Sequence, residues 1–297
     1  MHTVLGATGQ VGGIVAEELL AAGHSVRAIV RVPLLGQFLK DQGAELAVAD
    51  ATLSVTLRRA FDGAEAAFVL NPPASESPDL FRVSADVCRA LRSALAASGV
   101  PRVVVLSSIG AHLDSGTGIV ATDHLLEAAL YDCAPRVTIV RSAWFMENWA
   151  AGVWPAKTKG LLPSMLAPVE RAIPQISVVD VGRICAQAMQ GGPPGTTIVE
   201  AEGPREYSPQ DVAQVLSGVL GRKVEAVPLA EEQWEDVFCE TGDSRRTALA
   251  RIQAVRAINE GSLAFEGGHR RVLGRRTLEG VCCGPGPRPA EALGAVV

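Results

Sequence analysis

Residues 1–31 read MHTVLGATGQVGGIVAEELLAAGHSVRAIVR, and this stretch decides the fold. The short apolar run over residues 2–5 is typical of a buried strand. Apolar residues then recur at helical spacing over residues 11–22, and Gly23 marks the end of that helix. A second apolar run, over residues 25–31, predicts another strand. The order strand, glycine loop, helix, strand predicts a βαβ unit.

Three glycines at a spacing of three, Gly6, Gly9 and Gly12, form the loop between the first strand and the helix. In a βαβ unit the first glycine permits a tight turn and the second lets the backbone approach a pyrophosphate. The third lets helix and strand pack closely. The N–H groups at the helix N-terminus also attract phosphate. The loop therefore predicts a dinucleotide site, and the alternative is a glycine-rich turn that binds no nucleotide.

The end of the second strand indicates which dinucleotide is bound. An Asp or Glu there suits the ribose 2′-OH of NAD, whereas an Arg suits a 2′-phosphate. The strand ends at Arg31, Arg27 also lies on it, and the next acidic residue is Asp41. Because a guanidinium pairs bidentately with phosphate, we predict that the cofactor is NADP(H). The alternative is that Arg31 is only a solvated charge at the strand end.

The composition is that of an ordinary soluble chain. It has 297 residues, 48% of them hydrophobic, and a formal net charge of −5. This mild acidity, without a Lys/Arg run, disfavours a nucleic-acid partner, and no apolar run has the length of a membrane span. The first strand begins at once, so we expect no signal peptide and a cytoplasmic protein. We expect the six scattered cysteines to be free thiols, and the five histidines show no metal-ligand spacing.

The chain continues to alternate strand and helix up to residue 143. Further strands are predicted at 45–49, 66–70, 102–106 and 136–140, with helices at 34–41, 54–61, 80–98 and 119–131. This alternation predicts an α/β fold with a doubly wound, parallel Rossmann sheet. Ligands of such sheets bind beyond the carboxyl ends of the strands. Besides the glycine loop, the side chains at those ends are Arg31, Asp50, Asn71, Ser107 and Ser142.

A change of pattern after residue 143 predicts a second, smaller lobe. Residues 144–160, WFMENWAAGVWPAKTKG, hold three of the four tryptophans and little strand character. A helix at 179–190 and a strand at 196–200 then return to the sheet. We predict a NADP-binding Rossmann domain of residues 1–143 and 176–202, and a smaller α/β substrate lobe of residues 144–175 and 203–281. The Gly/Pro-rich residues 282–297 are expected to form a disordered tail.

Several segments together resemble the NmrA-like family, an atypical branch of the short-chain dehydrogenase/reductase superfamily. They are GATGQVGG at the first turn, VRAIVR in the second strand, LSSIGA after the fifth strand and TIVRSAWFMENW after the sixth. The later stretch EAEGPREYSPQDVAQVLSGVLGRKV is similar to the substrate lobe of that family. The resemblance implies NADP(H) binding. It also implies either reduction of quinones, dyes or other conjugated compounds, or cofactor binding without turnover in a redox sensor.

The resemblance also implies where the cofactor meets this chain. Arg31 would contact the 2′-phosphate, and Asp50 would lie near the adenine. Asn71 and Ser107 would lie on the nicotinamide side. The loop residues expected to hold the cofactor are Gly6, Thr8, Gly9, Gln10, Val11 and Gly12.

The catalytic group departs from the usual pattern. Most short-chain dehydrogenases use a Tyr-x-x-x-Lys pair, in which the lysine lowers the tyrosine pKa so that the phenol can pass a proton. The only tyrosines are Tyr131 and Tyr207, and four residues after them stand Pro135 and Asp211. The pair is therefore absent from this sequence.

Two other candidates for the catalytic group are His124 and Ser107. NmrA-like relatives often carry a His or Lys four residues before a helical Glu; Glu127 matches that Glu, but Asp123 stands four residues before it and His124 one position late. On a helix His124 and Glu127 are neighbours at i, i+3. His124 either donates a proton or is a surface histidine. Ser107 either hydrogen-bonds a substrate oxygen or only caps its strand.

The aromatic segment completes the predicted site. Trp144, Phe145 and Met146 are expected to line an aromatic substrate pocket, or to pack the joint between the lobes, and both can hold at once. We predict an NADP(H)-dependent reductase that transfers a hydride to a small conjugated substrate such as a quinone, dye or enone. The main alternative is a non-catalytic NADP(H) sensor that acts through a protein partner; an isomerase or epimerase is less favoured because the tyrosine is absent. We expect a monomer or homodimer.

Overall fold

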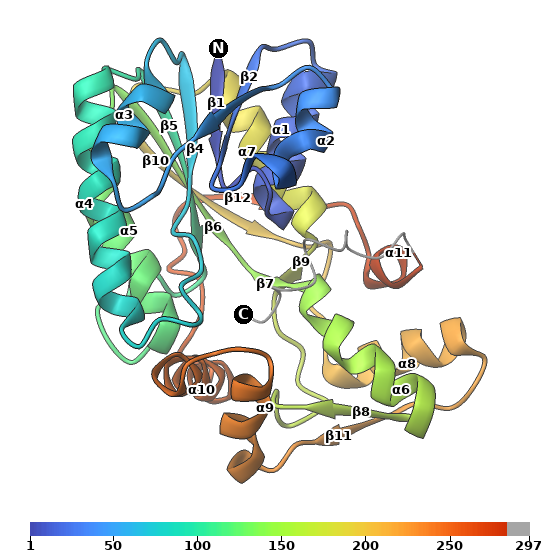
Figure 1. The fold of residues 1–297 in the computed structure, drawn as a ribbon. Coiled ribbons are helices and arrows are strands. Elements are labelled where there is room, and N and C mark those ends of the chain that lie inside the picture. The colour runs from blue at the N-terminus through green and yellow to red at the C-terminus, as the bar shows by residue number, and fades with distance from the viewer. Residues whose placement is uncertain (284–297) are drawn as a thin grey trace.

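The computed structural model describes residues 1–283, and a sheet of eight parallel strands forms its centre (Figure 1). The strands lie in the order β12-β10-β6-β5-β4-β1-β2-β3. Their bounds are β1 (His2–Leu5), β2 (Val26–Val30), β3 (Glu45–Val48), β4 (Ala66–Val69), β5 (Arg102–Ser108), β6 (Arg136–Ser142), β10 (Gly195–Glu202) and β12 (Arg270–Leu273). Every neighbouring pair is parallel, which confirms the predicted α/β, doubly wound sheet. The strand order reverses between β1 and β4.

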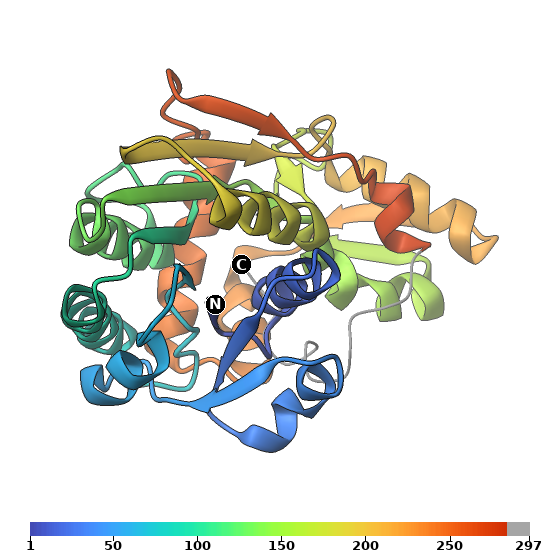
Figure 2. The same ribbon diagram turned by 90° about the horizontal axis from the view of Figure 1, so that it is seen from above.

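Helices cover both faces of the sheet, as the view from above shows (Figure 2). One apolar core packs under α1 (Gln10–Ala21), α2 (Gln37–Asp41) and α7 (Val178–Gln190). The other packs under α3 (Ser54–Phe61), α4 (Leu80–Ser98) and α5 (Ala121–Leu130). Both cores consist almost entirely of Val, Leu, Ile, Ala and Phe, and each large apolar side chain buried in this way contributes about 1.5–3 kcal/mol.

The smaller lobe lies below the sheet in Figure 1 and has its own core. Its elements are β7 (Trp144–Phe145), α6 (Val153–Lys159), β8 (Leu161–Ser164), β9 (Gln175–Ile176), α8 (Pro209–Leu220), β11 (Glu225–Pro228), α9 (Trp234–Glu240), α10 (Arg245–Glu260) and α11 (Leu278–Cys282). Four 3-10 turns complete the described chain: Pro33–Gly36, Gly118–Val120, Met146–Gly152 and Glu231–Gln233. Tyr207 and Phe238 are almost fully buried here, so the lobe is held by apolar packing as the sheet is.

One segment lies elsewhere than its sequence predicts. Residues 270–273, expected in the substrate lobe, pair in parallel with β10 and form the edge of the large sheet. The strand reads RRVL and is largely exposed, and Arg271 donates to Glu202 of β10 at 2.6 Å. Short, charged strands are typical of sheet edges. Such a strand lacks the apolar run by which the buried strands are predicted.

The end of the described chain bears on three further expectations. Of the predicted tail, Cys282 ends α11 and Cys283 follows it, while residues 284–297 lie outside the described residues. The six cysteines are all free. Within residues 1–283, no helix combines the length and the hydropathy that a bilayer crossing requires.

Candidate functional site

The glycine loop lies beside the point where the strand order reverses. The Gly9 N–H donates to the Gly6 carbonyl at 2.9 Å, which closes the turn, and Gly6 has a φ of +68°, in the region that favours glycine. A Cβ on Gly12 would stand 2.3 Å from the Gly6 carbonyl oxygen. Only glycine therefore lets α1 begin this close to the end of β1. This is the backbone geometry that a pyrophosphate cradle requires.

The N-terminus of α1 faces this loop without protein anions of its own. Gly9 supplies no side-chain cap, and no acidic residue stands in the first turn of the helix. Thr8 is half-buried and Gly9 is exposed. Because the N-terminus of a helix carries a partial positive charge, this end suits a phosphate ligand.

Arg31 and Asp50 follow β2 and β3 at the same edge of the sheet. Both are exposed. Thr52 donates to Asp50 Oδ1 from its N–H at 2.8 Å and from its hydroxyl at 2.7 Å. These bonds, with a smaller contribution from the charge of Arg31, hold the pKa of the Asp50 carboxyl below its usual value. Asp50 thus stays ionised, and Arg31 lies near enough for its charge to act on that carboxylate.

The second arginine of this strand, Arg27, serves the fold instead. Its Nε donates to Glu45 at 2.8 Å, and its NH1 donates to the carbonyls of Ala60 and Asp62 at 2.9 and 2.8 Å. The guanidinium therefore ties β2 to β3 and to the end of α3. Of the two arginines that the sequence offers for a phosphate, only Arg31 has its guanidinium exposed beyond the strand.

Ser107 belongs to a buried ion network at the end of β5. It is 3% exposed, and its hydroxyl donates to Glu127 of α5. Arg141 of β6 clamps the same carboxylate through Nε at 2.9 Å and NH2 at 2.7 Å, and it also binds Glu266. A hydroxyl has one proton to donate. With that proton directed at Glu127, Ser107 can accept a hydrogen bond from a ligand but has no proton to give it.

His124 and Glu127 do not form the pair that their spacing suggests. No hydrogen bond joins them in the described part of the chain; Glu127 points to β5 and β6, and His124 Nδ1 bonds the Ala111 carbonyl at 2.9 Å. His124 therefore ties the segment after β5 to α5. At the end of β4, Asn71 Nδ2 donates to the hydroxyl of Ser84 on α4 at 2.6 Å.

Asp123 is the charged residue that the sequence motif leaves without a role. It lies in the first turn of α5 and is half-buried. No hydrogen bond or ion pair links its carboxylate to any of residues 1–283. Burial, together with the negative charge of Glu127, raises the pKa of Asp123 to about 7. The sequence signal for this residue is its place four positions before Glu127, where the resemblance described above leads us to expect a His or Lys.

The three residues predicted to line a substrate pocket have different surroundings. Trp144 and Phe145 are half-buried on β7, which pairs with β9 where the two lobes join. The Trp144 ring meets the ring of Trp149 edge-on, with centroids 5.1 Å apart. Met146 is 1% exposed and packs in the core of the smaller lobe. Trp144 and Phe145 can face a ligand, whereas Met146 is part of the core of the smaller lobe.

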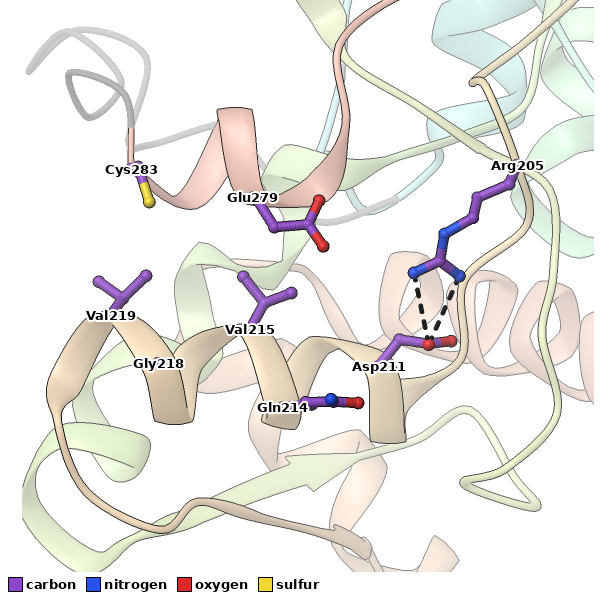
Figure 3. A pocket seen from close by; sticks show the side chains of 8 residues that line it. All are labelled: Arg205, Asp211, Gln214, Val215, Gly218, Val219, Glu279 and Cys283. Carbon is purple, nitrogen blue, oxygen red and sulfur yellow. Dashed lines mark hydrogen bonds and ion pairs between the residues drawn. The ribbon is translucent and has the colours of Figure 1, made fainter.

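A hollow of about 410 Å³ lies away from these residues, between α8 and α11 (Figure 3). Its lining residues are Arg205, Asp211, Gln214, Val215, Gly218, Val219, Glu279 and Cys283. Both terminal nitrogens of Arg205 point to the Asp211 carboxylate, at 3.4 and 3.5 Å. None of the residues predicted for cofactor or substrate lines it. Among residues 1–283, no group of His, Cys, Asp or Glu side chains is arranged to hold a metal ion.

Comparison with known proteins identifies the family to which this chain belongs. The sequence profile of the NmrA-like family matches residues 2–261. The chain belongs to the NmrA-like family. This NmrA-like chain is 28% identical over 233 residues to an NAD(P)H azoreductase of Xenophilus azovorans, a match that covers 78% of each protein. It is 26% identical over 234 residues to quinone oxidoreductase 2 of Escherichia coli, again over 78% of each.

Solved structures agree with the family on the fold. The NADPH-dependent quinone oxidoreductase of Escherichia coli, complexed with NADPH, aligns with a TM-score of 0.76 at 23% identity, over 94% of this NmrA-like chain and 97% of the other. The Citrobacter sp. triphenylmethane reductase complexed with NADP(H) aligns with a TM-score of 0.72 at 23% identity, over 90% and 92%. At these identities the likeness shows a common fold.

Proposed function

We propose that this protein is an NADP(H)-dependent reductase of small conjugated acceptors such as quinones and dyes. The observation that carries the proposal is a set of groups suited to bind phosphate at the carboxyl edge of the sheet. There a glycine cradle, an α1 N-terminus without acidic residues and the exposed Arg31 stand together. The named relatives include an NAD(P)H azoreductase and a quinone oxidoreductase, which supports the same reading.

The residues present fit a dinucleotide with a 2′-phosphate. The pyrophosphate would lie on the loop of Gly6, Gly9 and Gly12, with the phosphate charge opposite the α1 dipole. Arg31 would pair with the 2′-phosphate, since no carboxylate stands at the end of β2 to bind a 2′-OH. Exposed apolar side chains flank this place and offer contact to the adenine ring: Val32, Leu34, Leu35 and Leu53.

The substrate end is built from the aromatic segment. The nicotinamide, when bound, supplies a hydride to the acceptor. Trp144 and Phe145, half-buried at the joint of the lobes, would stack against a flat conjugated ring and keep water from it. Ser107, whose hydroxyl is oriented by Glu127, would accept a hydrogen bond and position a ligand without supplying the proton.

Binding and turnover test the proposal in two steps. NADPH and NADH are first titrated by calorimetry, and NADPH oxidation is then followed at 340 nm with a panel of quinones, azo dyes and cationic dyes. We expect NADPH to bind and at least one acceptor class to be reduced. If NADPH binds but no acceptor is reduced, the reductase hypothesis is rejected in favour of the non-catalytic sensor. If NADPH does not bind, both hypotheses are rejected.

A pair of tryptophan variants tests the place of the substrate. Trp144→Ala should raise KM for the best acceptor about tenfold, since a stacked aromatic contact of about 1 kcal/mol and its buried area are lost. Trp154→Ala is the matched control, because Trp154 is 67% exposed on α6, and its KM should change less than about twofold. Equal effects of the two variants would move the pocket away from Trp144.

A further inference from the structure

The direction of α5 places its first turn beyond the ends of the strands. A helix that connects two parallel strands runs antiparallel to them, so α5 begins at the carboxyl edge of the sheet, between β5 and β6. Glu127 of this helix is hydrogen-bonded to Ser107, close to the end of β5. Asp123 lies on the same face, one helical turn or about 5.4 Å nearer the edge. Its carboxyl group therefore stands just past Ser107, where ligands of such sheets bind.

A second helix, α4, lies close to the carboxyl group of Asp123. On α4, the Cys88 thiol has its pKa raised to about 11 by burial, and the charge of Asp123 adds to that rise. Ser84, one turn away on α4, accepts the hydrogen bond from Asn71 at the end of β4. The Asp123 carboxyl thus lies close enough to α4 for its charge to act on Cys88. Its neighbours along the two helices, Ser84 and Glu127, are hydrogen-bonded to Asn71 and Ser107, which are the residues proposed for the nicotinamide side.

The groups that face Asp123 leave its charge uncompensated. Glu127 adds negative charge from α5, but Arg141 clamps Glu127 and is turned to it and to Glu266. Cys88, on α4, is a neutral thiol over the physiological pH range. No cation pairs with Asp123 among residues 1–283, so the protonated carboxyl is favoured there and a substantial share of it persists at neutral pH.

We propose that Asp123, rather than His124 or Ser107, is the group that gives the proton when a quinone-like acceptor is reduced at this site. The inference rests on the proposed function. Hydride transfer brings an electron pair and one hydrogen to the quinone and leaves a hydroquinone anion. The O–H bond of the Asp123 carboxyl then breaks as an O–H bond forms on that anion. Asp123 is partly exposed, so the resulting carboxylate can take its next proton from water.

Measuring the reduction of two different acceptors distinguishes proton donation by Asp123 from other effects of this residue. Reduction of a naphthoquinone needs a hydride and a proton, whereas a cationic triphenylmethane dye becomes neutral by taking a hydride alone. Asp123→Asn keeps the shape of the side chain and removes its proton. We expect it to lower kcat for the naphthoquinone about 100-fold at pH 6, within the range of general acid catalysis, and to change kcat for the dye less than about twofold. The NADPH dissociation constant should not change.

The pH profile and a matched variant complete the test. In the unsubstituted protein, kcat for the quinone should fall as pH rises above about 7, and Asp123→Asn should be low and flat. Asp132→Asn makes the same chemical change at an exposed position just beyond the opposite end of α5 and should leave both acceptors unaffected. Carboxyl ¹³C NMR of the protein without cofactor adds a readout free of turnover, in which Asp123 should titrate near 7.

Each contrary result has a distinct meaning. If Asp123→Asn lowers quinone and dye reduction equally, or lowers neither, the proton-donor role is overturned while the reductase stands. An unsubstituted protein that reduces only the dye also overturns the role, because its reaction contains no proton step. If no acceptor is reduced at all, the proposed function itself fails, and the role fails with it.

Discussion

The two halves of the carboxyl edge of the sheet differ in whether their polar groups are exposed or are buried and bonded within the protein. Around β1, β2 and β3, the groups proposed for the cofactor face outward: Gly9, Arg31 and Asp50 are exposed, and the α1 N-terminus has no side-chain cap. Around β5 and β6, Ser107, Glu127 and Arg141 are buried and bonded to one another. The first half resembles a site prepared for an external anion, and the second is a structural network that already satisfies itself.

This difference separates two kinds of sequence motif. A glycine pattern describes a backbone shape, and the shape is present wherever the glycines are. A polar motif such as Ser107 with Glu127 describes only residue types, and the bonds among them decide whether any group remains for a ligand. In the second half the Asp123 carboxylate has no hydrogen bond or ion pair within residues 1–283, and the motif marks this residue only by its departure from the relatives.

The largest expected effect tests whether the second half is structural. Glu127→Gln should lower the unfolding free energy by about 3 kcal/mol, since it leaves the buried guanidinium of Arg141 without its bidentate partner. Urea denaturation followed by circular dichroism measures it. Glu18→Gln is the control, because its ion pair with Arg183 is exposed and should contribute less than about 0.5 kcal/mol. Equal losses would show that burial of the network adds nothing.

The next effect tests whether the first half is a cradle. Gly12→Ala should weaken NADPH binding about 100-fold or more, because its Cβ would stand 2.3 Å from the Gly6 carbonyl oxygen and push the loop away from α1. Calorimetry measures the affinity, and thermal melting checks that the chain still folds. Gly191→Ala serves as the control, since an added Cβ there meets nothing within 4 Å and its φ of −166° suits any residue. A folded Gly12→Ala protein with unchanged affinity would contradict the cradle.

The fold could be predicted from the sequence because its signals are local. The strands of the large sheet up to β10 each contain a short apolar stretch, and the helices between them show helical spacing. β12 escaped prediction because an edge strand of sequence RRVL carries no apolar run; its place depends on pairing with β10, nearly 70 residues away. The residues of β12 themselves do not indicate which strand they pair with.

The site could be predicted only where backbone shape decides it. The positions of Gly6, Gly12 and Arg31 follow from the first βαβ unit alone. The partners of Ser107 and His124 do not, because Glu127 and Ala111 reach them from other segments of the chain. The environment of Asp123 is likewise set by α4, and burial between two helices leaves no trace in the residue's neighbours along the sequence.

A smaller effect concerns cofactor choice in the open half. We expect NADPH to bind about tenfold more tightly than NADH, which corresponds to about 1.4 kcal/mol, and Arg31→Asp to erase or reverse that preference. Arg27→Gln is a sharp control because it lies on the same strand but is bonded to Glu45 and to two carbonyls. It should reduce stability and leave the preference intact. Equal dissociation constants of the unsubstituted protein for the two cofactors would refute the assignment of Arg31.

The last prediction compares one acid from each half through the pH dependence of stability. The pKa of Asp123 is raised in the folded protein to about 7, so between about pH 4 and pH 7 the folded state holds a proton that the unfolded state has lost. The unfolding free energy therefore falls as pH rises through that window. Asp123→Asn removes this fall, so its stability relative to the unsubstituted protein should be greater at pH 8 than at pH 4.

For Asp50, the expected change of stability with pH has the opposite sign. Its pKa is lowered in the folded protein, mainly by the hydrogen bonds from Thr52, so it stabilises the fold above the unfolded pKa and loses that contribution as pH falls through the folded pKa. Asp50→Asn should therefore be less stable than the unsubstituted protein at pH 7, and the difference should shrink on acidification. Chemical denaturation of both variants at several pH values measures the two slopes. Slopes of the same sign would mean that the two halves of the edge do not differ in how they hold charge, and the comparison between them would fail.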